Sequence, residues 1–139
     1  MNKLALSNQL CFSVYAVSRH ITSLYRSILE ELDITYPQYL VMLIMWEQSE
    51  VTVKQLGEQL YLDSGTLTPL LKRLEQKELI IRERSKTDER SVIVTLTELG
   101  RSKREHAKCI PENIFKALNI SPEEYYSIKN QLDSILKNK

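Results

Sequence analysis

The sequence predicts a mainly helical domain that carries one small β-hairpin, and three observations support this prediction. The chain has 139 residues, the length of one domain with room for a substantial core. Its composition is 42% hydrophobic and 27% charged with only three glycines, which is typical of a globular, helix-rich protein. Apolar residues recur every three or four positions along most of the chain, whereas one stretch alternates as strands do. We therefore expect a single domain over residues 1–139.

The first predicted element is a long amphipathic helix over residues 6–32. Its apolar residues fall every three or four positions, at Leu6, Leu10, Val14, Val17, Ile21, Leu24, Ile28 and Leu32. Such a helix would span roughly 40 Å. Because this is long for so small a domain, we expect part of the apolar stripe to pack against something outside its own domain.

Two capping boxes then predict the starts of two short helices. Thr35 with Gln38 opens a helix whose segment 39–46 is apolar on every side, which indicates burial. Thr52 with Gln55 opens the next helix, which has an apolar face.

The helix that follows has two possible starts. Asp63 or Ser64 fits as its N-cap, but Thr68 followed by Pro69 fits as an N-cap and a first helical residue as well. A start at Ser64 places Pro69 in the second turn and predicts a local distortion. In either case leucines at helical spacing continue the segment to residue 78.

Residues 80–84 and 91–96 have β-branched, alternating character, and the charged sequence SKTDER lies between them. This pattern predicts a two-stranded hairpin. Two helices complete the chain, the first from Thr97 to Leu118 with a bend or pause at Pro111, the second after a capping signal at Ser121.

The formal net charge of +1 excludes a protein coated uniformly in positive charge, so any nucleic-acid surface must be local. Between residues 52 and 96 the predicted order is helix, tight turn, helix and hairpin. This is the order of a winged helix-turn-helix, in which the second helix, the recognition helix, enters the major groove of double-stranded DNA.

The residue types in this region fit DNA binding. Hydroxyls at the start of the recognition helix can reach phosphates or base edges, and basic residues follow on the helix and on the hairpin. In order, these candidates are Ser64, Thr66, Thr68, Lys72, Arg73, Lys77, Arg82, Arg84, Lys86 and Arg90. Each alone is better explained as a helix cap or a solvated charge, but the ordered set favours DNA binding. Asp88 and Glu89 lower the net charge of the hairpin turn, so geometry should matter more than bulk field.

The sequence predicts neither a metal site nor a membrane segment. The two cysteines, Cys11 and Cys109, lie too far apart for a zinc-binding pair, and His20 and His106 are the only histidines, so we expect no metal and no cofactor. No segment reads as a signal peptide or a membrane span, so we expect a cytoplasmic protein without a membrane partner, whose thiols are kept reduced.

The strings LDSGTLTPLLKRLE (62–75) and TDERSVIVTLTELG (87–100) resemble the multiple antibiotic resistance regulator (MarR) family of dimeric winged-helix transcription factors. The resemblance covers almost the whole chain. It implies a homodimer formed by the terminal helices, residues 6–32 and 97–139, and a winged helix-turn-helix lobe at 35–96. It also favours a start of the recognition helix near Ser64, which brings Gly65 and Pro69 into the candidate set.

The same resemblance assigns roles on the hairpin, the wing of the family. Arg90 would enter the minor groove, and Asp88 would hold an arginine such as Arg73 or Arg90 in position. A dimer of this kind implies a pseudo-palindromic operator.

A second constellation surrounds Cys11, near the start of the first helix, where the helix dipole favours a thiolate. The alternative is a small buried hydrophobic residue. Tyr15 shares the face of Cys11. Tyr25 points the same way but lies roughly 20 Å along the helix, so it could meet Cys11 only across a dimer, where Tyr36 could join it. Phenol hydroxyls that donate to sulfur favour the thiolate.

The string QLCFSVY, with Tyr25 and the sequence Ile34-Thr35-Tyr36-Pro37, is similar to the organic hydroperoxide resistance regulator branch of the family and its staphylococcal relatives. The resemblance implies that Cys11 is oxidised to a sulfenic acid, hydrogen-bonded by Tyr25 and Tyr36 of the other subunit, and that oxidation releases DNA. Some members carry a second cysteine that resolves the sulfenic acid into an intersubunit disulfide. Cys109 is a candidate for that role, and the alternatives are capping by a small thiol or further oxidation of the sulfenic acid.

The leading hypothesis is therefore a homodimeric repressor, not an enzyme, that senses organic hydroperoxide or a related oxidant through Cys11. The first alternative is a MarR-type repressor released by a small phenolic or anionic ligand, with Cys11 structural. The second is a thiol peroxidase that uses Cys11 and Cys109. No glycine-rich or strand-based scaffold surrounds Cys11, and Arg19 is the one arginine near it, which disfavours the peroxidase.

Overall fold

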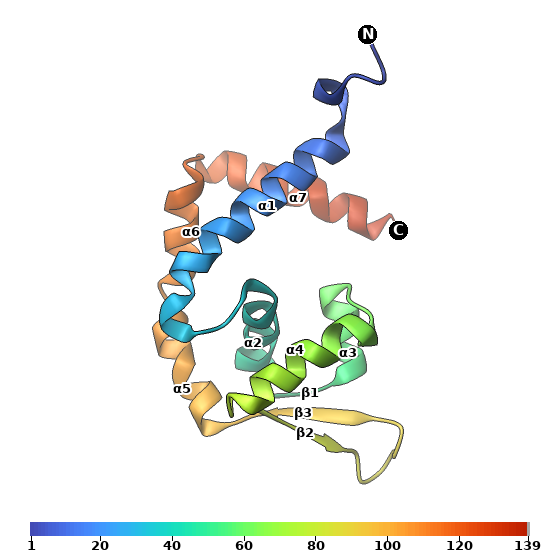
Figure 1. The fold of residues 1–139 in the computed structure, drawn as a ribbon, viewed down its shortest axis with the longest axis vertical. Helices are drawn as coiled ribbons and strands as arrows, with labels where there is room; N and C mark the ends of the chain where they lie inside the picture. Colours follow the sequence, from blue (N-terminus) through green and yellow to red (C-terminus); the bar gives the residue numbers. More distant parts are fainter. Residues whose placement is uncertain (139) are drawn as a thin grey trace. The chain divides into compact units, whose positions relative to one another are not determined.

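The computed structural model describes residues 1–138 and has helices with one three-stranded antiparallel sheet (Figure 1). The 3₁₀ turns are η1 (Leu6–Asn8) and η2 (Glu30–Leu32), and the strands are β1 (Glu50–Thr52), β2 (Ile80–Arg84) and β3 (Val92–Leu96). The α-helices are α1 (Leu10–Ile28), α2 (Tyr36–Gln48), α3 (Val53–Leu60), α4 (Ser64–Gln76), α5 (Glu98–Ala107), α6 (Ile110–Leu118) and α7 (Pro122–Lys137). No helix within residues 1–138 has the length and apolarity needed to cross a bilayer. The predicted mainly helical fold with a β-hairpin wing is confirmed.

The chain forms two compact units. The larger is Tyr25–Lys108, and the smaller joins Met1–Leu24 to the chain from Cys109 onward. These boundaries differ from the expected 32/35 and 96/97, because η2 and α5 pack within the larger unit. Leu29 and Leu32, which were expected on a dimerisation helix, are buried in its core.

The prediction of one continuous helix over residues 6–32 is wrong. The chain makes the turn η1, becomes extended at Gln9, and enters α1 at Leu10. After α1 ends at Ile28, the turn η2 closes with Asp33 in the left-handed region, at φ 52°. This break redirects the chain so that Leu29 and Leu32 enter the core, which a straight helix would not allow.

The predicted helix starts in the larger unit are confirmed. Thr35 and Thr52 form complete capping boxes with the glutamines three residues later. Asp63 is the N-cap of α4, and its Oδ1 accepts a hydrogen bond of 2.7 Å from the backbone N–H of Thr66. Pro69 therefore lies inside the helix, as a start at Ser64 requires. Tyr36 is the first residue of α2.

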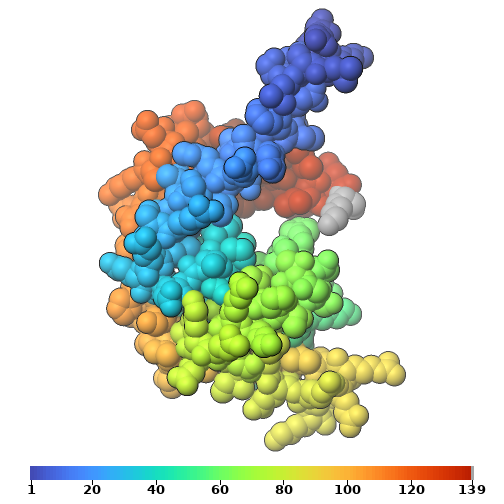
Figure 2. Space-filling model, in the orientation of Figure 1, coloured from blue at the N-terminus to red at the C-terminus, as the bar shows by residue number. Residues whose placement is uncertain are grey.

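The sheet has the strand order β1–β3–β2. The predicted hairpin is confirmed, and in it β2 pairs with β3 so that Ile80 lies opposite Leu96 and Arg84 opposite Val92. β1 was not predicted, because a three-residue strand has no periodicity of its own and forms only by pairing Val51 with Val94. The turn between β2 and β3 extends from its unit as the yellow tip in Figure 2.

The core of the larger unit lies between α2, α3, α4 and the sheet. Met42, Leu56, Leu67, Leu74 and Val94 are fully buried there. Leu67, Leu71 and Leu74 of α4 point into this core, whereas Leu70 is half-buried, so the opposite face of the helix is directed to solvent.

The smaller unit contains α6 and α7, and the ring of Phe115 packs 5.5 Å from that of Tyr125. The predicted pause before Pro111 is confirmed, since α5 ends at Ala107 and α6 begins at Ile110. α1 and α7 have no buried residue. Their exposed large apolar residues are Leu10, Phe12, Val14, Tyr15, Val17, Tyr126, Ile128, Leu132, Ile135 and Leu136.

Candidate nucleic-acid interface and thiol site

The first two turns of α4 present a small, polar surface. Ser64, Gly65, Thr66, Thr68 and Pro69 are all exposed, because Leu67, Leu71 and Leu74 face the core. The Thr68 hydroxyl donates to the carbonyl of Ser64 at 2.7 Å. Lys72 and Arg73 continue the exposed face one turn later. The structure thus brings the predicted recognition-helix residues onto one accessible face.

The wing turn is held by its own hydrogen bonds. The Ser85 hydroxyl oxygen accepts from the backbone N–H groups of Thr87 and Asp88, both at 3.2 Å. The Arg84 guanidinium donates to the carbonyl of Glu89 at 2.9 Å. These bonds fix the backbone of the turn while Lys86 and Arg90 stay exposed.

Asp88 contacts Arg90 in a different way from the one expected. Its Oδ1 accepts from the backbone N–H of Arg90 at 3.1 Å. Among residues 1–138, no ion pair joins Asp88 to the guanidinium of Arg90 or of Arg73. Asp88 therefore shapes the turn and leaves the Arg90 side chain available to an external partner.

Arg82, expected on the basic surface, is an internal tether instead. Its Nη2 lies 3.0 Å from Oε1 of Glu75, and its backbone N–H donates to Oε2 of Glu75, also at 3.0 Å. The hydrogen bond from the Arg82 backbone is the main cause that lowers the pKa of Glu75, followed by the bond from its side chain. No local pattern predicts this pair, because Glu75 belongs to a helix and Arg82 to a strand.

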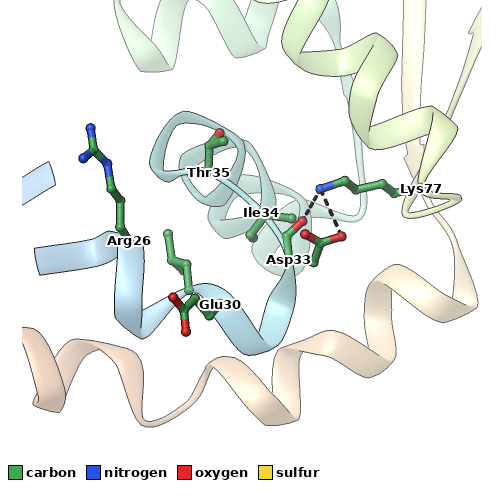
Figure 3. A pocket seen from close by; sticks show the side chains of 7 residues that line it. Arg26, Glu30, Asp33, Ile34, Thr35 and Lys77 are labelled. Atoms are coloured by element: carbon green, nitrogen blue, oxygen red, sulfur yellow. Dashed lines mark hydrogen bonds and ion pairs between the residues drawn. The ribbon is translucent and has the colours of Figure 1, made fainter. Parts of the chain in front are cut away.

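Lys77 is engaged as well. Its ammonium donates to the backbone carbonyl of Asp33 and lies 3.6 Å from Oδ2 of the same residue. These contacts close one side of a pocket of about 250 Å³ (Figure 3). Figure 3 shows Lys77 reaching Asp33 from one side, with Arg26 on the opposite side. The pocket is lined by Arg26, Leu29, Glu30, Asp33, Ile34, Thr35 and Lys77.

Two of the predicted tyrosines meet. The ring centroids of Tyr25 and Tyr36 are 4.4 Å apart, and Tyr39 lies 5.6 Å from Tyr25. Burial raises the pKa of Tyr39, and the neighbouring Tyr36 raises it further. Trp46 packs edge-on against Tyr39, with the ring centroids 6.3 Å apart. Sequence reasoning missed Tyr39 and Trp46, although their spacing of three and ten residues from Tyr36 places all three on one side of α2.

The remaining thiol-site residues belong to the smaller unit. Cys11 is the second residue of α1, near a helix start as predicted, and its side chain is exposed. Tyr15 is also exposed, with the Arg19 guanidinium 5.6 Å from its ring centroid. Cys109 is the exposed N-cap of α6. Neither cysteine is in a disulfide within the described part of the chain.

A metal site has no support in residues 1–138, where no three histidine, cysteine or acidic side chains are grouped to hold an ion.

The chain is similar to known transcriptional regulators. A family model described as "Transcriptional regulator SarA/Rot" matches residues 23–107. The organic hydroperoxide resistance transcriptional regulator of Bacillus subtilis is 52% identical over 132 residues, covering 95% of this chain and 90% of the relative. The resemblance to hydroperoxide regulators inferred from the motifs is confirmed.

Solved structures of AbfR, a protein of Staphylococcus epidermidis, are also similar. Reduced AbfR bound to DNA has a TM-score of 0.79 and 41% identity, covering 96% of this chain and 93% of that one. Disulfide-formed AbfR has a TM-score of 0.65 and 42% identity, covering 96% and 90%.

Proposed function

The chain belongs to the SarA/Rot family of transcriptional regulators, and on that premise we propose that it is a homodimeric DNA-binding repressor released from its operator by an organic hydroperoxide or a related oxidant. One observation supports an oxidant as the signal. This chain, 52% identical to a hydroperoxide resistance regulator, has an exposed Cys11 at a helix start and places the ring centroids of Tyr25 and Tyr36 4.4 Å apart. The proposed site of action is the cytoplasm.

The proposed dimer forms through the apolar faces of α1 and α7. Neither helix buries a residue within its own subunit, and both carry rows of exposed apolar side chains. Burying such rows between two subunits supplies the hydrophobic free energy that one subunit leaves unused. A two-fold dimer presents two copies of α4 to a pseudo-palindromic operator.

In the proposed complex, α4 enters the major groove with Ser64, Gly65, Thr66, Thr68 and Pro69 foremost. Lys72 and Arg73 contact phosphates further along the helix, and Arg90 enters the minor groove from the wing, where Arg84 and Lys86 add positive charge. The exposure of these residues supports this assignment. Lys77 and Arg82 serve the fold instead, because their cationic groups are held by Asp33 and Glu75.

The proposed sensing step is a two-electron oxidation. The Cys11 thiolate attacks the distal oxygen of the peroxide, the O–O bond breaks, and the alkoxide that leaves takes up a proton to become an alcohol. Sulfur is oxidised to sulfenic acid while the peroxide is reduced. Tyr25 and Tyr36 of the partner subunit donate hydrogen bonds to the sulfur. Oxidised sulfur interacts differently with the two dimer geometries and so shifts their populations.

The fate of the sulfenic acid has two alternatives. The Cys109 thiol of the partner subunit can attack the sulfenic sulfur, forming an intersubunit disulfide and releasing water. Otherwise a small cellular thiol forms the mixed disulfide. A Cys109→Ser variant separates them, since only the first route loses its crosslinked dimer on a non-reducing gel.

A second candidate function is release by a small anionic ligand, and the pocket beside Arg26 and Lys77 is the observation that favours it. A ligand there would compete with Asp33 for Lys77, whereas Cys11 would have no regulatory role.

The deciding experiment measures operator binding by fluorescence anisotropy for reduced protein and after a stoichiometric dose of cumene hydroperoxide. Wild type should lose affinity on oxidation and recover it with dithiothreitol, and Cys11→Ser should keep its affinity throughout. Cys109→Ser, measured in parallel, shows whether release from the operator requires the intersubunit disulfide. Unchanged wild-type affinity, with Cys11 shown by mass spectrometry to be oxidised, would refute the proposal. Sustained peroxide turnover with a reductant would indicate a peroxidase.

A further inference from the structure

An aromatic row in the larger unit leads from the proposed sensing tyrosines to the helix α5. Tyr36 packs against Tyr39 with ring centroids 6.4 Å apart, and Tyr39 packs against Trp46. The indole Nε1–H of Trp46 donates to the carbonyl oxygen of Gly100, in the first turn of α5, at 2.9 Å. The row therefore ends in a polar bond to another helix.

Gly100 lies directly against the chain that leaves the recognition helix. A Cβ atom at this position would be only 2.2 Å from the carbonyl oxygen of Leu79, closer than any side chain tolerates. Glycine is thus required by the approach of two backbones, and α5 has no freedom to shift toward Leu79.

Three hydrogen bonds through Thr97 lock this contact. The backbone N–H of Thr97 donates to the carbonyl of Leu79 at 3.2 Å, and its hydroxyl donates to the carbonyl of Glu78 at 2.7 Å. The same hydroxyl oxygen accepts from the N–H of Gly100 at 2.9 Å.

Glu78 and Leu79 in turn terminate α4. The N–H of Glu78 donates to the carbonyl of Glu75 at 2.9 Å, and that of Leu79 to the carbonyl of Leu74 at 3.1 Å. The four residues Glu78, Leu79, Thr97 and Gly100, here named the α4–α5 junction, thus join the end of the recognition helix to the start of α5. Trp46 connects α2 to this junction.

We propose that Trp46 is a positioning residue that transmits a displacement of Tyr25 and Tyr36 to the α4–α5 junction and so to α4. The inference rests on the proposed function. α2 is a continuous helix whose Val41, Met42 and Met45 are fully buried, so a push at Tyr36 moves its far end rather than being absorbed locally. The hydrogen bond to Gly100 converts that movement into a movement of α5 and the end of α4.

The test exploits the single tryptophan of the chain. Biosynthetic replacement of tryptophan by benzothienylalanine puts sulfur in place of the Nε1–H group and keeps the ring shape at this position alone. The reduced variant should bind the operator within about twofold of wild type, while the ratio of oxidised to reduced Kd should fall at least about fivefold. Trp46→Phe provides the same test by mutagenesis, with a thermal melt to check folding.

Gln48→Met is the matched control. Gln48 also ties α2 to a neighbour, through a 3.0 Å hydrogen bond to Gln59 on α3, but this bond does not reach α5. Its ratio of Kd values should equal that of wild type. In wild type, oxidation without DNA should also shift the Trp46 fluorescence emission as its hydrogen bond changes, and Cys11→Ser should abolish the shift.

The outcomes separate this inference from the proposed function. Wild type that releases DNA on oxidation, together with a benzothienylalanine variant that releases it equally well, overturns the role of Trp46 alone. Wild type that retains DNA on oxidation overturns both. An oxidised wild type with unshifted Trp46 emission also counts against the role of Trp46.

Discussion

The carboxylate of Glu75 binds both the backbone and the side chain of Arg82. One carboxylate oxygen of Glu75 accepts the backbone N–H of Arg82 at 3.0 Å, and the other accepts the guanidinium Nε and Nη2 at 3.2 and 3.0 Å. Because Glu75 is in the last turn of α4 and Arg82 is in β2, the pair fixes the wing relative to the recognition helix.

Glu75→Gln should therefore destabilise the protein. The amide keeps one acceptor but loses the charge-assisted bonds, which we expect to lower the free energy of unfolding by about 1 kcal/mol. Urea denaturation of wild type and variant measures this difference. Gln76→Glu, a charge change on the neighbouring exposed residue, is the control and should be neutral within about 0.5 kcal/mol. Equal stability of Glu75→Gln and wild type would show that the pair contributes nothing.

The same pair predicts an acid-dependent loss of stability. The folded-state pKa of Glu75 is lowered below its ordinary value of 4.5, by hydrogen bonding from Arg82 above all. The stabilisation is therefore complete above pH 4.5 and is lost as the pH falls through the lowered folded value. Unfolding free energies measured between about pH 6 and pH 3 should fall less steeply in Glu75→Gln than in wild type. Parallel pH profiles would contradict this assignment.

Arg90→Ala should weaken DNA binding without affecting the fold. The Arg90 side chain is exposed, and its backbone contact to Asp88 survives the change. Loss of one minor-groove arginine per subunit should reduce operator affinity about tenfold or more. Anisotropy at several salt concentrations measures the affinity, and a melt measures the fold. A lowered melting temperature with unchanged affinity would mean that Arg90 is structural.

Lys77→Met should have the opposite pattern. It removes the ammonium that binds the Asp33 carbonyl at the turn before α2, while its methylenes are largely preserved. We expect a loss of about 1 kcal/mol in unfolding free energy and an unchanged salt dependence of DNA binding. Lys72→Met, on the exposed face of α4, is the matched control and should reduce the salt dependence instead. A flatter salt dependence of DNA binding in Lys77→Met would show that Lys77 contacts DNA.

Gly65→Ala should stabilise the fold and weaken DNA binding. A Cβ there meets only Asp63 Oδ1 at 3.7 Å, an ordinary contact, and the residue has no positive φ. Alanine should gain about 0.5–1 kcal/mol of helix stability. The protein itself therefore gives no reason for glycine, and in the proposed complex the added methyl faces DNA. A melting temperature and an operator affinity that both rise would contradict close approach of DNA at Gly65.

Features set by neighbouring residues were predictable. The capping boxes at Thr35, Thr52 and Ser121 and the pause before Pro111 depend on groups within a few positions of each other, and the hairpin joins two strands that adjoin in the sequence. The exposed face of α4 followed in the same way from the spacing of its leucines.

Two features of the fold were not predictable, because distant partners decide them. The apolar stripe of residues 6–32 continues without interruption, yet the helix ends at Ile28 because Leu29 and Leu32 gain more by entering the core. β1 forms because it hydrogen-bonds to β3, whose residues lie more than 40 positions further along the sequence. The periodicity of the apolar residues contains no information about either effect.

By itself, the sequence determined the order of the main helices and the hairpin, the recognition-helix face and the identity of the cysteines and tyrosines. Only the tertiary structure decided which cations stay available to DNA: Asp33 and Glu75 engage Lys77 and Arg82, while Arg90 remains exposed. It also placed Tyr25 beside Tyr36 and Trp46 against Gly100. The physical reason is that helix periodicity depends on residues close together in the sequence. The partner of a charged group, an aromatic ring or a hydrogen-bond donor depends instead on which distant segments the folded chain brings together.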